Sequence, residues 1–177
     1  MITYAKPINF LALVALFGSV TFAQQPPSPG PEHAELKLLE GDWDFELKSP
    51  DGTSAKGTSK FKMECGGMWL MSDFRCDFGG MPFQGRGMDG YDLSKKKHVS
   101  VWVDSMISAP MLFEGSYDAK REKLTMFADA PGPDGNPAKW RSVTMMKDKD
   151  HQTFEMYVAP IGGKEQQMMT VEYVRKK

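Results

Sequence analysis

The sequence predicts an all-β protein: a single antiparallel up-and-down β-barrel of about ten strands with one short N-terminal helix. Segments with strand patterns follow one another at regular spacing, and short runs rich in Gly, Pro and Asp separate them. Only one stretch has a helical period, and it precedes the strands. Mostly short connections favour an up-and-down meander, whose closure removes exposed strand edges.

The first 23 residues have the pattern of a secretory signal peptide. Lys6 supplies the positive charge, residues 8–20 form an apolar stretch, and Ala23 is a small residue suited to cleavage. The apolar stretch is shorter than the roughly 20 residues that span a bilayer, which favours a cleaved signal peptide. An uncleaved N-terminal anchor is the alternative. We therefore predict a secreted or periplasmic protein with a signal peptide over 1–23, a proline-rich linker over 24–32, and a barrel domain over 33–177.

The helix is expected to begin at Pro31, because proline suits the first helical turn. Leu36 and Leu39 share one side of it, and Gly41 is a suitable residue to follow its end. After Gly41 the period changes to two, which is typical of strands with one buried face. The predicted strands are 42–48, 58–65, 68–78, 83–91, 97–105, 110–117, 123–129, 139–147, 152–159 and 165–175.

Hairpin geometry predicts which side chains share a face, because directly opposed residues of antiparallel strands point the same way. A turn at Gly66-Gly67 places Met63 opposite Leu70. A connection over 79–82 places Phe78 opposite Phe83 and Leu70 opposite Tyr91. The predicted inner face of these three strands contains Phe61, Met63, Leu70, Phe74, Cys76, Phe83 and Tyr91.

A turn at Gly162-Gly163 predicts a second set of inward residues in the last two strands. That set is Phe154, Met156, Val158, Met169, Val171 and Tyr173. Glu155 and Glu172 fall on the opposite face, where we interpret them as surface residues rather than catalytic ones.

The strand over 97–105 has two alternative orientations. If Asp92 pairs with Lys97, the side chains of His98, Ser100, Trp102 and Asp104 point inward with Tyr91. One more residue in the loop would instead turn Val99, Val101 and Val103 inward. The first alternative would give the interior polar groups for a ligand, and a buried Asp104 would then need partners or its pKa would rise.

Charge and cysteine content exclude several classes of function. The chain has 22 Lys and Arg against 23 Asp and Glu, which argues against a nucleic-acid partner held by bulk electrostatics. The two cysteines, Cys65 and Cys76, lie far apart along the predicted hairpin. A disulfide needs Cα atoms within about 7 Å, so we predict two buried free thiols and no disulfide.

The leading functional hypothesis is a binding protein that encloses a small apolar or amphipathic ligand. The chain contains 14 Met, whose flexible side chains suit adaptable cavities. The same side chains could instead fill a solid core, as in other small barrels. Candidate lumen residues are Phe74, Tyr91, Trp102, Asp104, Met156, Tyr173 and Arg175.

Two further hypotheses remain open. Asp104, Tyr91 and Arg175 could form an acid/base site if they met at one barrel mouth, although no catalytic motif is present and a non-enzyme is favoured. His98 or His151 could in principle bind haem, although a lone histidine is more often structural. We expect no metal site, no cofactor and no membrane span after signal cleavage.

An ordered series of short motifs resembles the exported bacterial proteins grouped as domain of unknown function 1579. The matching residues are His33, Leu36, Gly41, Trp43, Gly66, Gly67, Pro82, Phe83, Gly85, Gly90, Tyr91, Asp92, Trp102, Asp104, Ser105, Met106, Glu114, Gly115, Tyr117, Asp118, Glu172, Tyr173 and Arg175. The resemblance spans residues 33–175 and implies a calycin-like barrel, akin to lipocalins and fatty-acid-binding proteins. It implies no particular activity.

Overall fold

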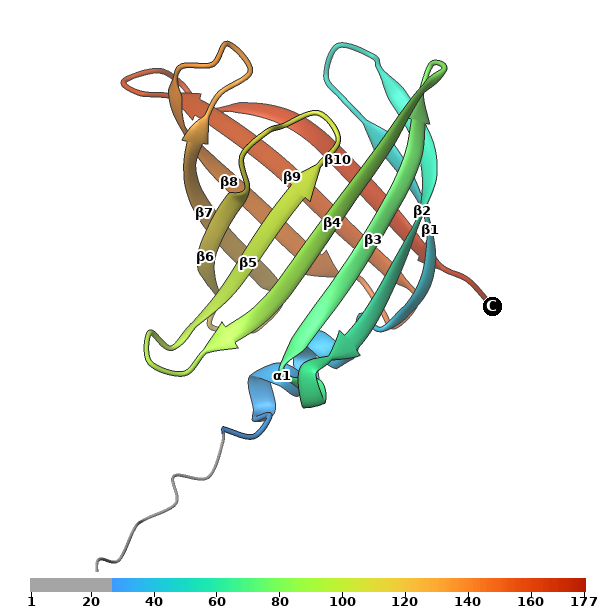
Figure 1. Ribbon diagram of the computed structural model, residues 1–177, viewed down its shortest axis with the longest axis vertical. Helices are drawn as coiled ribbons and strands as arrows, with labels where there is room; N and C mark the ends of the chain where they lie inside the picture. Colours follow the sequence, from blue (N-terminus) through green and yellow to red (C-terminus); the bar gives the residue numbers. More distant parts are fainter. Residues whose placement is uncertain (1–26) are drawn as a thin grey trace, which may run out of the picture.

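Ten antiparallel strands form a closed barrel, and one short helix lies against one end of it (Figure 1). The computed structural model describes residues 27–177. Each strand pairs with its sequence neighbours, and β1 pairs with β10 to close the wall, which confirms the predicted fold class. The elements are α1 (Pro31–Lys37), β1 (Gly41–Lys48), β2 (Ser54–Glu64), β3 (Trp69–Phe78), β4 (Met81–Asp92), β5 (Lys97–Asp104), β6 (Met111–Tyr117), β7 (Lys123–Pro131), β8 (Pro137–Met146), β9 (His151–Pro160) and β10 (Gln166–Arg175).

The predicted signal peptide, residues 1–23, lies outside the described residues. Among residues 27–177, no helix is long and apolar enough to cross a membrane.

The largest difference from the predicted bounds is the start of β2. The prediction began this strand at residue 58, whereas it begins at Ser54, which pairs with Lys48. Ser54, Ala55 and Gly57 have weak strand preferences. Their backbone nevertheless continues the ladder with β1, so tertiary pairing outweighs local preference here.

The β2–β3 hairpin has the predicted register, with Met63 opposite Leu70 and Lys60 opposite Asp73. The β3–β4 hairpin is shifted by two residues, and the predicted pairing of Phe78 with Phe83 was wrong: Phe78 pairs with Met81.

The cause of the shift is a tight two-residue turn at Gly79 and Gly80. Both glycines have positive φ, 65° and 97°, as such turns require. The prediction had treated 79–82 as a longer connection. Because side-chain direction repeats every two residues, a shift of two leaves every side chain on its predicted face.

The register also settles which face of β5 is inside. Asp92 pairs with Lys97 and Tyr91 with His98, so the first alternative is the correct one. His98 is buried, whereas Val103 is 45% exposed on the outer wall. The β9–β10 pair has the predicted register too, with Met156 opposite Met169, and a bulge follows between Gln167 and Met169.

The end of the barrel beside α1 is closed by helix and side chains together. His33 and Leu36 of α1 are buried, at 2% and 3% exposure. The Trp43 indole donates a hydrogen bond of 2.9 Å to the Leu39 carbonyl, in the segment that joins α1 to β1. The helix is thereby attached to the first strand of the barrel.

Arg175, at the end of β10, completes this closure. Its guanidinium carbon lies 4.1 Å from the centre of the Trp43 ring. The guanidinium also donates hydrogen bonds to the backbone carbonyls of Leu38, Glu40 and Lys149. One side chain thus joins the last strand to the segment that precedes the first.

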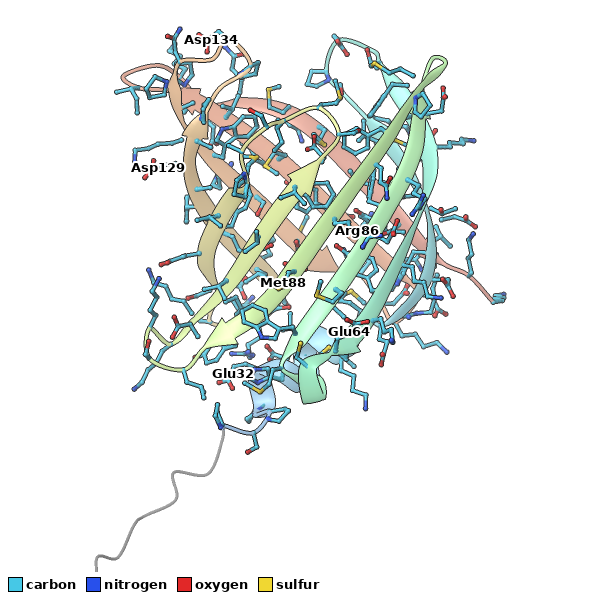
Figure 2. The ribbon with its side chains drawn as sticks, viewed as in Figure 1. Glu32, Glu64, Arg86, Met88, Asp129 and Asp134 are labelled. Atoms are coloured by element: carbon cyan, nitrogen blue, oxygen red, sulfur yellow. The ribbon has the colours of Figure 1, made fainter. Side chains whose placement is uncertain are left out.

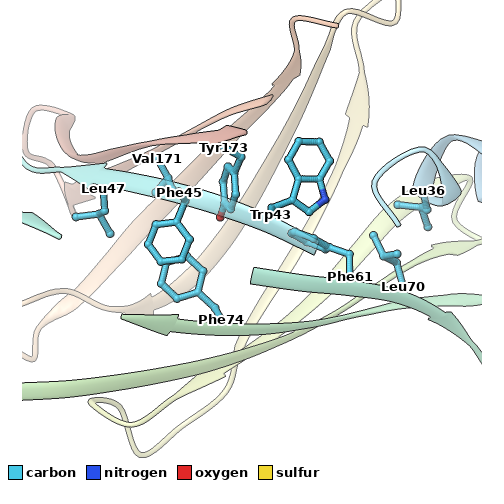
Figure 3. Close-up of a cluster of buried hydrophobic side chains, with 9 residues drawn as sticks. All are labelled: Leu36, Trp43, Phe45, Leu47, Phe61, Leu70, Phe74, Val171 and Tyr173. Carbon is cyan, nitrogen blue, oxygen red and sulfur yellow. The ribbon is translucent and has the colours of Figure 1, made fainter. Parts of the chain in front are cut away.

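Above this closure, aromatic side chains pack together (Figure 3). The rings of Phe45 and Phe74 stack with their centres 3.9 Å apart. Tyr173 packs edge-on against Trp43 and Phe61. The cluster comprises Leu36, Trp43, Phe45, Leu47, Phe61, Leu70, Phe74, Val171 and Tyr173.

We predict that Arg175→Met lowers the free energy of unfolding by about 2–3 kcal/mol. Methionine keeps much of the packing on Trp43 but removes the cation and the donors for three carbonyls. Urea denaturation would measure the loss. The control is Arg86→Met on the exposed outer wall, where the ion pair with Asp73 contributes about 0–1 kcal/mol. Equal losses in the two variants would contradict the role given to Arg175.

Candidate functional site

The buried apolar side chains inside the barrel form two separate clusters rather than one. The first is the aromatic cluster of Figure 3, which centres on β1, β2, β3 and β10. The second lies on β6 and β7 and comprises Phe113, Leu124, Met126 and Ala128. Half-buried side chains lie between the two clusters, with Trp102 and Phe154 packed against the first and Met156 against the second.

Several inward-pointing side chains between these clusters keep accessible surface. They alternate with outward residues such as Arg86 and Met88, which are labelled on β4 in Figure 2. The half-buried inward residues are Asp89, Ser100, Trp102, Phe154 and Met156. Since the wall around them is closed, their accessible surface faces the barrel interior. We call this interior space the lumen.

The two ends of the lumen differ. α1 lies against one end, beside the turn between β2 and β3 (Figure 1). The opposite end is surrounded by the connections β1–β2, β3–β4, β5–β6, β7–β8 and β9–β10, and no helix of the described residues lies across it. We call the second one the open end.

A row of polar side chains crosses the lumen wall from β2 to β5: Ser59, Ser72, Asp89 and Ser100. Asp89 lies directly opposite Ser100, whose hydroxyl lowers the pKa of the carboxylate. Ser72 and Asp89 flank Gly87, where a Cβ would overlap the Ser72 hydroxyl. The Ser59 hydroxyl is buried and has no hydrogen-bond partner. Polar groups therefore occupy the middle of an otherwise apolar interior.

Asp89 is the charged group of this row. Burial raises the pKa of Asp89 to about 6, and the hydrogen bond from Ser100 offsets part of that rise. Near neutral pH the carboxylate is mostly ionised, and no ion pair with it occurs among residues 27–177. Burial, and then the nearby Asp89 charge, also raise the pKa of Tyr173, which leaves that phenol neutral.

Three of the seven predicted lumen residues lie around the middle of the barrel: Phe74, Trp102 and Met156. Phe74 and Trp102 meet edge to face, with ring centres 6.0 Å apart. Trp102 lies across Gly85, where a Cβ would overlap the indole. The small residue is therefore what allows the tryptophan to lie flat on the inner wall.

The other four predicted residues lie nearer the two ends. Tyr91 lies toward the α1 end, with its ring centre 5.1 Å from that of His98. Tyr173 and Arg175 belong to the same half of the barrel, and Arg175 uses its donors for the closure described above.

Asp104 lies at the open end, where β5 finishes. Its carboxylate accepts a 2.8 Å hydrogen bond from the Trp102 indole. It also accepts bonds from the backbone N–H groups of Met106 and Ile107, at 2.7 and 3.1 Å. We expected an inward Asp104 to need partners. Those partners are the Trp102 indole and the backbone of the β5–β6 loop.

The structure does not bring Asp104, Tyr91 and Arg175 to one mouth. Tyr91 pairs with His98, and Asp104 lies six residues further along β5, which is about 20 Å of strand. Arg175 is at the α1 end with Tyr91. The acid/base arrangement considered from the sequence is therefore not formed.

The two histidines considered for haem lie away from the middle of the lumen. His98 is buried between Tyr91 and Tyr117, and burial lowers its pKa. His151 is exposed, and its Nδ1 lies 2.9 Å from the Asp148 carboxylate. Within residues 27–177 no group of three His, Cys, Asp or Glu side chains is placed to hold a metal ion.

The cysteines are both free thiols. Cys76 lies opposite Gly57 as predicted, and burial raises the pKa of its half-buried thiol. Cys65 is exposed, contrary to the burial expected from the sequence, because it begins a single 3₁₀ turn (Cys65–Gly67) between β2 and β3. Neither thiol belongs to the polar row.

Sequence reasoning missed Asp89, the charged residue of the lumen. The sequence could have identified Asp89, because it is two residues from Tyr91 in the same strand and must therefore point inward with it. The predicted register placed Tyr91 opposite Leu70, whereas Asp89 occupies that position. The candidate named from the sequence was Asp104 instead. Its carboxylate accepts hydrogen bonds from the Trp102 indole and from the backbone of Met106 and Ile107.

Comparison with known proteins supports the fold. Residues 28–175 match the family described as "Protein of unknown function (DUF1579)". A search of curated proteins gave no match.

Among solved structures, the crystal structure of Rv2717c from M. tuberculosis is 14% identical with a TM-score of 0.62, covering 84% of this chain and 99% of that one. A de novo designed fluorescence-activating β-barrel is 18% identical with a TM-score of 0.46, covering 80% and 96%. The redesigned barrel mFAP1, bound to DFHBI, is 14% identical with a TM-score of 0.44, covering 79% and 97%. The likeness to Rv2717c shows a shared fold.

We predict that Asp89→Asn stabilises the protein in a pH-dependent way. The pKa of Asp89 is raised on folding, so the folded state binds the proton more tightly and loses stability as pH rises from about 4 to about 6. The variant lacks this loss and gains about 1–2 kcal/mol at pH 7.5, with little gain at pH 4.

Urea denaturation at pH 4, 5, 6 and 7.5 would measure this difference. Asp129→Asn is the matched control, since its carboxylate is exposed on the outside of β7 (Figure 2). A pH-independent difference between Asp89→Asn and the wild type would show that Asp89 is not a desolvated acid.

Proposed function

The chain belongs to the family of proteins of unknown function DUF1579, and we propose that it is an exported binding protein that holds a small apolar or amphipathic molecule in its lumen. The observation that carries this proposal is the accessible surface of inward side chains in the middle of a closed wall. A solid core would bury these side chains fully, as Trp43 and Leu70 are buried at the α1 end, with 0% exposure each.

The chemistry of the lumen lining suits such a molecule. Phe74, Trp102 and Phe154 offer apolar rings, and Met156 offers a flexible side chain that adapts to different shapes. Apolar walls with a few polar groups are typical of small-molecule sites. The polar row supplies such groups along a diagonal of the lumen wall, with Asp89 directly opposite Ser100.

Export is the second part of the proposal, and it rests on the pattern of residues 1–23. We expect the protein, expressed in a Gram-negative host, to be recovered from the periplasm or medium with Gln24 as its first residue. The intact mass of the purified protein would check this. An intact mass that retains Met1 to Ala23 would contradict cleavage.

Lumen binding is tested with Nile red, a neutral apolar dye whose fluorescence rises on leaving water. We expect the wild type to bind it, and Ser100→Phe to weaken binding at least tenfold because the new ring occupies the lumen beside Asp89. Val101→Phe is the matched control: it adds the same ring one residue along, on the outer face of β5. Fluorescence titration would give both affinities.

Two results would contradict lumen binding. Wild-type protein that leaves Nile red fluorescence unchanged would show that the interior admits no apolar probe of this size. Equal weakening by Ser100→Phe and Val101→Phe would place the dye outside the barrel. Circular dichroism of both variants confirms that each remains folded.

A further inference from the structure

We infer that the bound molecule carries a protonated amine, and that its ammonium group pairs with Asp89 in the middle of the lumen. This inference rests on the proposed function, since it names the chemical class of the molecule that the lumen binds. The charges and the aromatic rings that face the interior favour this class of molecule.

The charge inside the lumen is negative. Among residues 27–177, the inward strand positions with a full charge are Asp89, Asp104 and Arg175. Arg175 donates to backbone carbonyls at the α1 end, and Asp104 accepts from Trp102 and the rim loop. Asp89 has no such partner besides the Ser100 hydroxyl. A cation is therefore the group that would complete this site.

Unpaired acceptors lie in the same half of the interior. The Ser59 hydroxyl and the Gln152 side-chain carbonyl are in residues 3% and 5% exposed, and neither atom has a hydrogen-bond partner. In the register Ser59 lies two strands from Asp89 and four residues along from the level of Asp89, and Gln152 lies opposite Tyr173, whose pKa is raised in part by the Asp89 charge. An ammonium group has three donors and no acceptor, so it suits the Asp89 carboxylate better than a second carboxylate does.

Aromatic rings complete the site. Trp102 lies within 3.5 Å of the place where a Gly87 side chain would begin, beside Asp89. Phe74 stacks on Phe45 and meets Trp102 edge to face. Ring faces attract cations and also accept apolar groups. An amphipathic amine would thus place its head at Asp89 and its tail among the rings toward the open end.

The same features disfavour an anionic amphiphile. A carboxylate head in this position would lie beside the ionised Asp89, and like charges in a poorly hydrated interior repel strongly. A neutral alcohol would meet no repulsion but would gain no ion pair. Head-group charge should therefore decide affinity when the tail is kept constant.

The experiment compares decylamine, decan-1-ol and decanoate, which share one tail, as competitors of Nile red at pH 7.5. For the wild type we expect decylamine to bind at least tenfold more tightly than decan-1-ol, and decanoate most weakly. Asp89→Asn should bring decylamine within threefold of decan-1-ol, with each competitor compared against the Nile red affinity of the same variant. Asp129→Asn, an exposed outer carboxylate, should leave the whole order unchanged.

The outcomes separate the two proposals. Nile red binding with no preference for decylamine, or a preference that survives Asp89→Asn, overturns the amine inference and leaves lumen binding standing. A preference lost equally in Asp129→Asn assigns it to surface charge and also overturns the inference. Failure of Nile red and all three decyl compounds to bind overturns both proposals. Thermal unfolding followed by circular dichroism verifies the fold of each variant.

Discussion

The pairing of β1 with β10 is the constraint on which the rest of the structure depends. Without these hydrogen bonds the ten strands would form an open sheet with two unpaired edges and no enclosed face. Trp43 and Arg175 lie opposite each other in this pair, and both also bind the segment between α1 and β1. The residues that seal the wall thus also seal one end.

The two parts of the interior differ in how they affect stability. Beside α1, residues such as Trp43 and Leu70 are fully enclosed and contribute packing. In the middle, Asp89 lies in surroundings that disfavour its charge, which opposes folding near neutral pH. Strongly shifted acids without a structural partner are typical of functional sites. Packing at the enclosed end offsets the cost of burying the Asp89 carboxylate.

The open end is linked to the lumen through Asp104. Its carboxylate bonds the Trp102 indole on one side and the backbone of the β5–β6 loop on the other. In that loop Met106 and Ile107 are 62% and 40% exposed. The position of a lumen ring and the conformation of a rim loop are therefore coupled by one carboxylate. This coupling gives Asp104 a structural role that its spacing in the sequence did not reveal.

The sequence alone determined the strand order, the single helix and the face of nearly every strand residue. These features follow from a period of two and from local turns, which is why the inner face of β3 and β4 was correct even with a two-residue error in register. The tertiary structure decided the orientation of β5, the sealing of one end by Arg175, and the half-buried state of Asp89 inside a closed wall. Those features depend on contacts across the barrel between residues far apart in the chain. Alternation along one strand carries no information about whether the space enclosed by ten strands is filled.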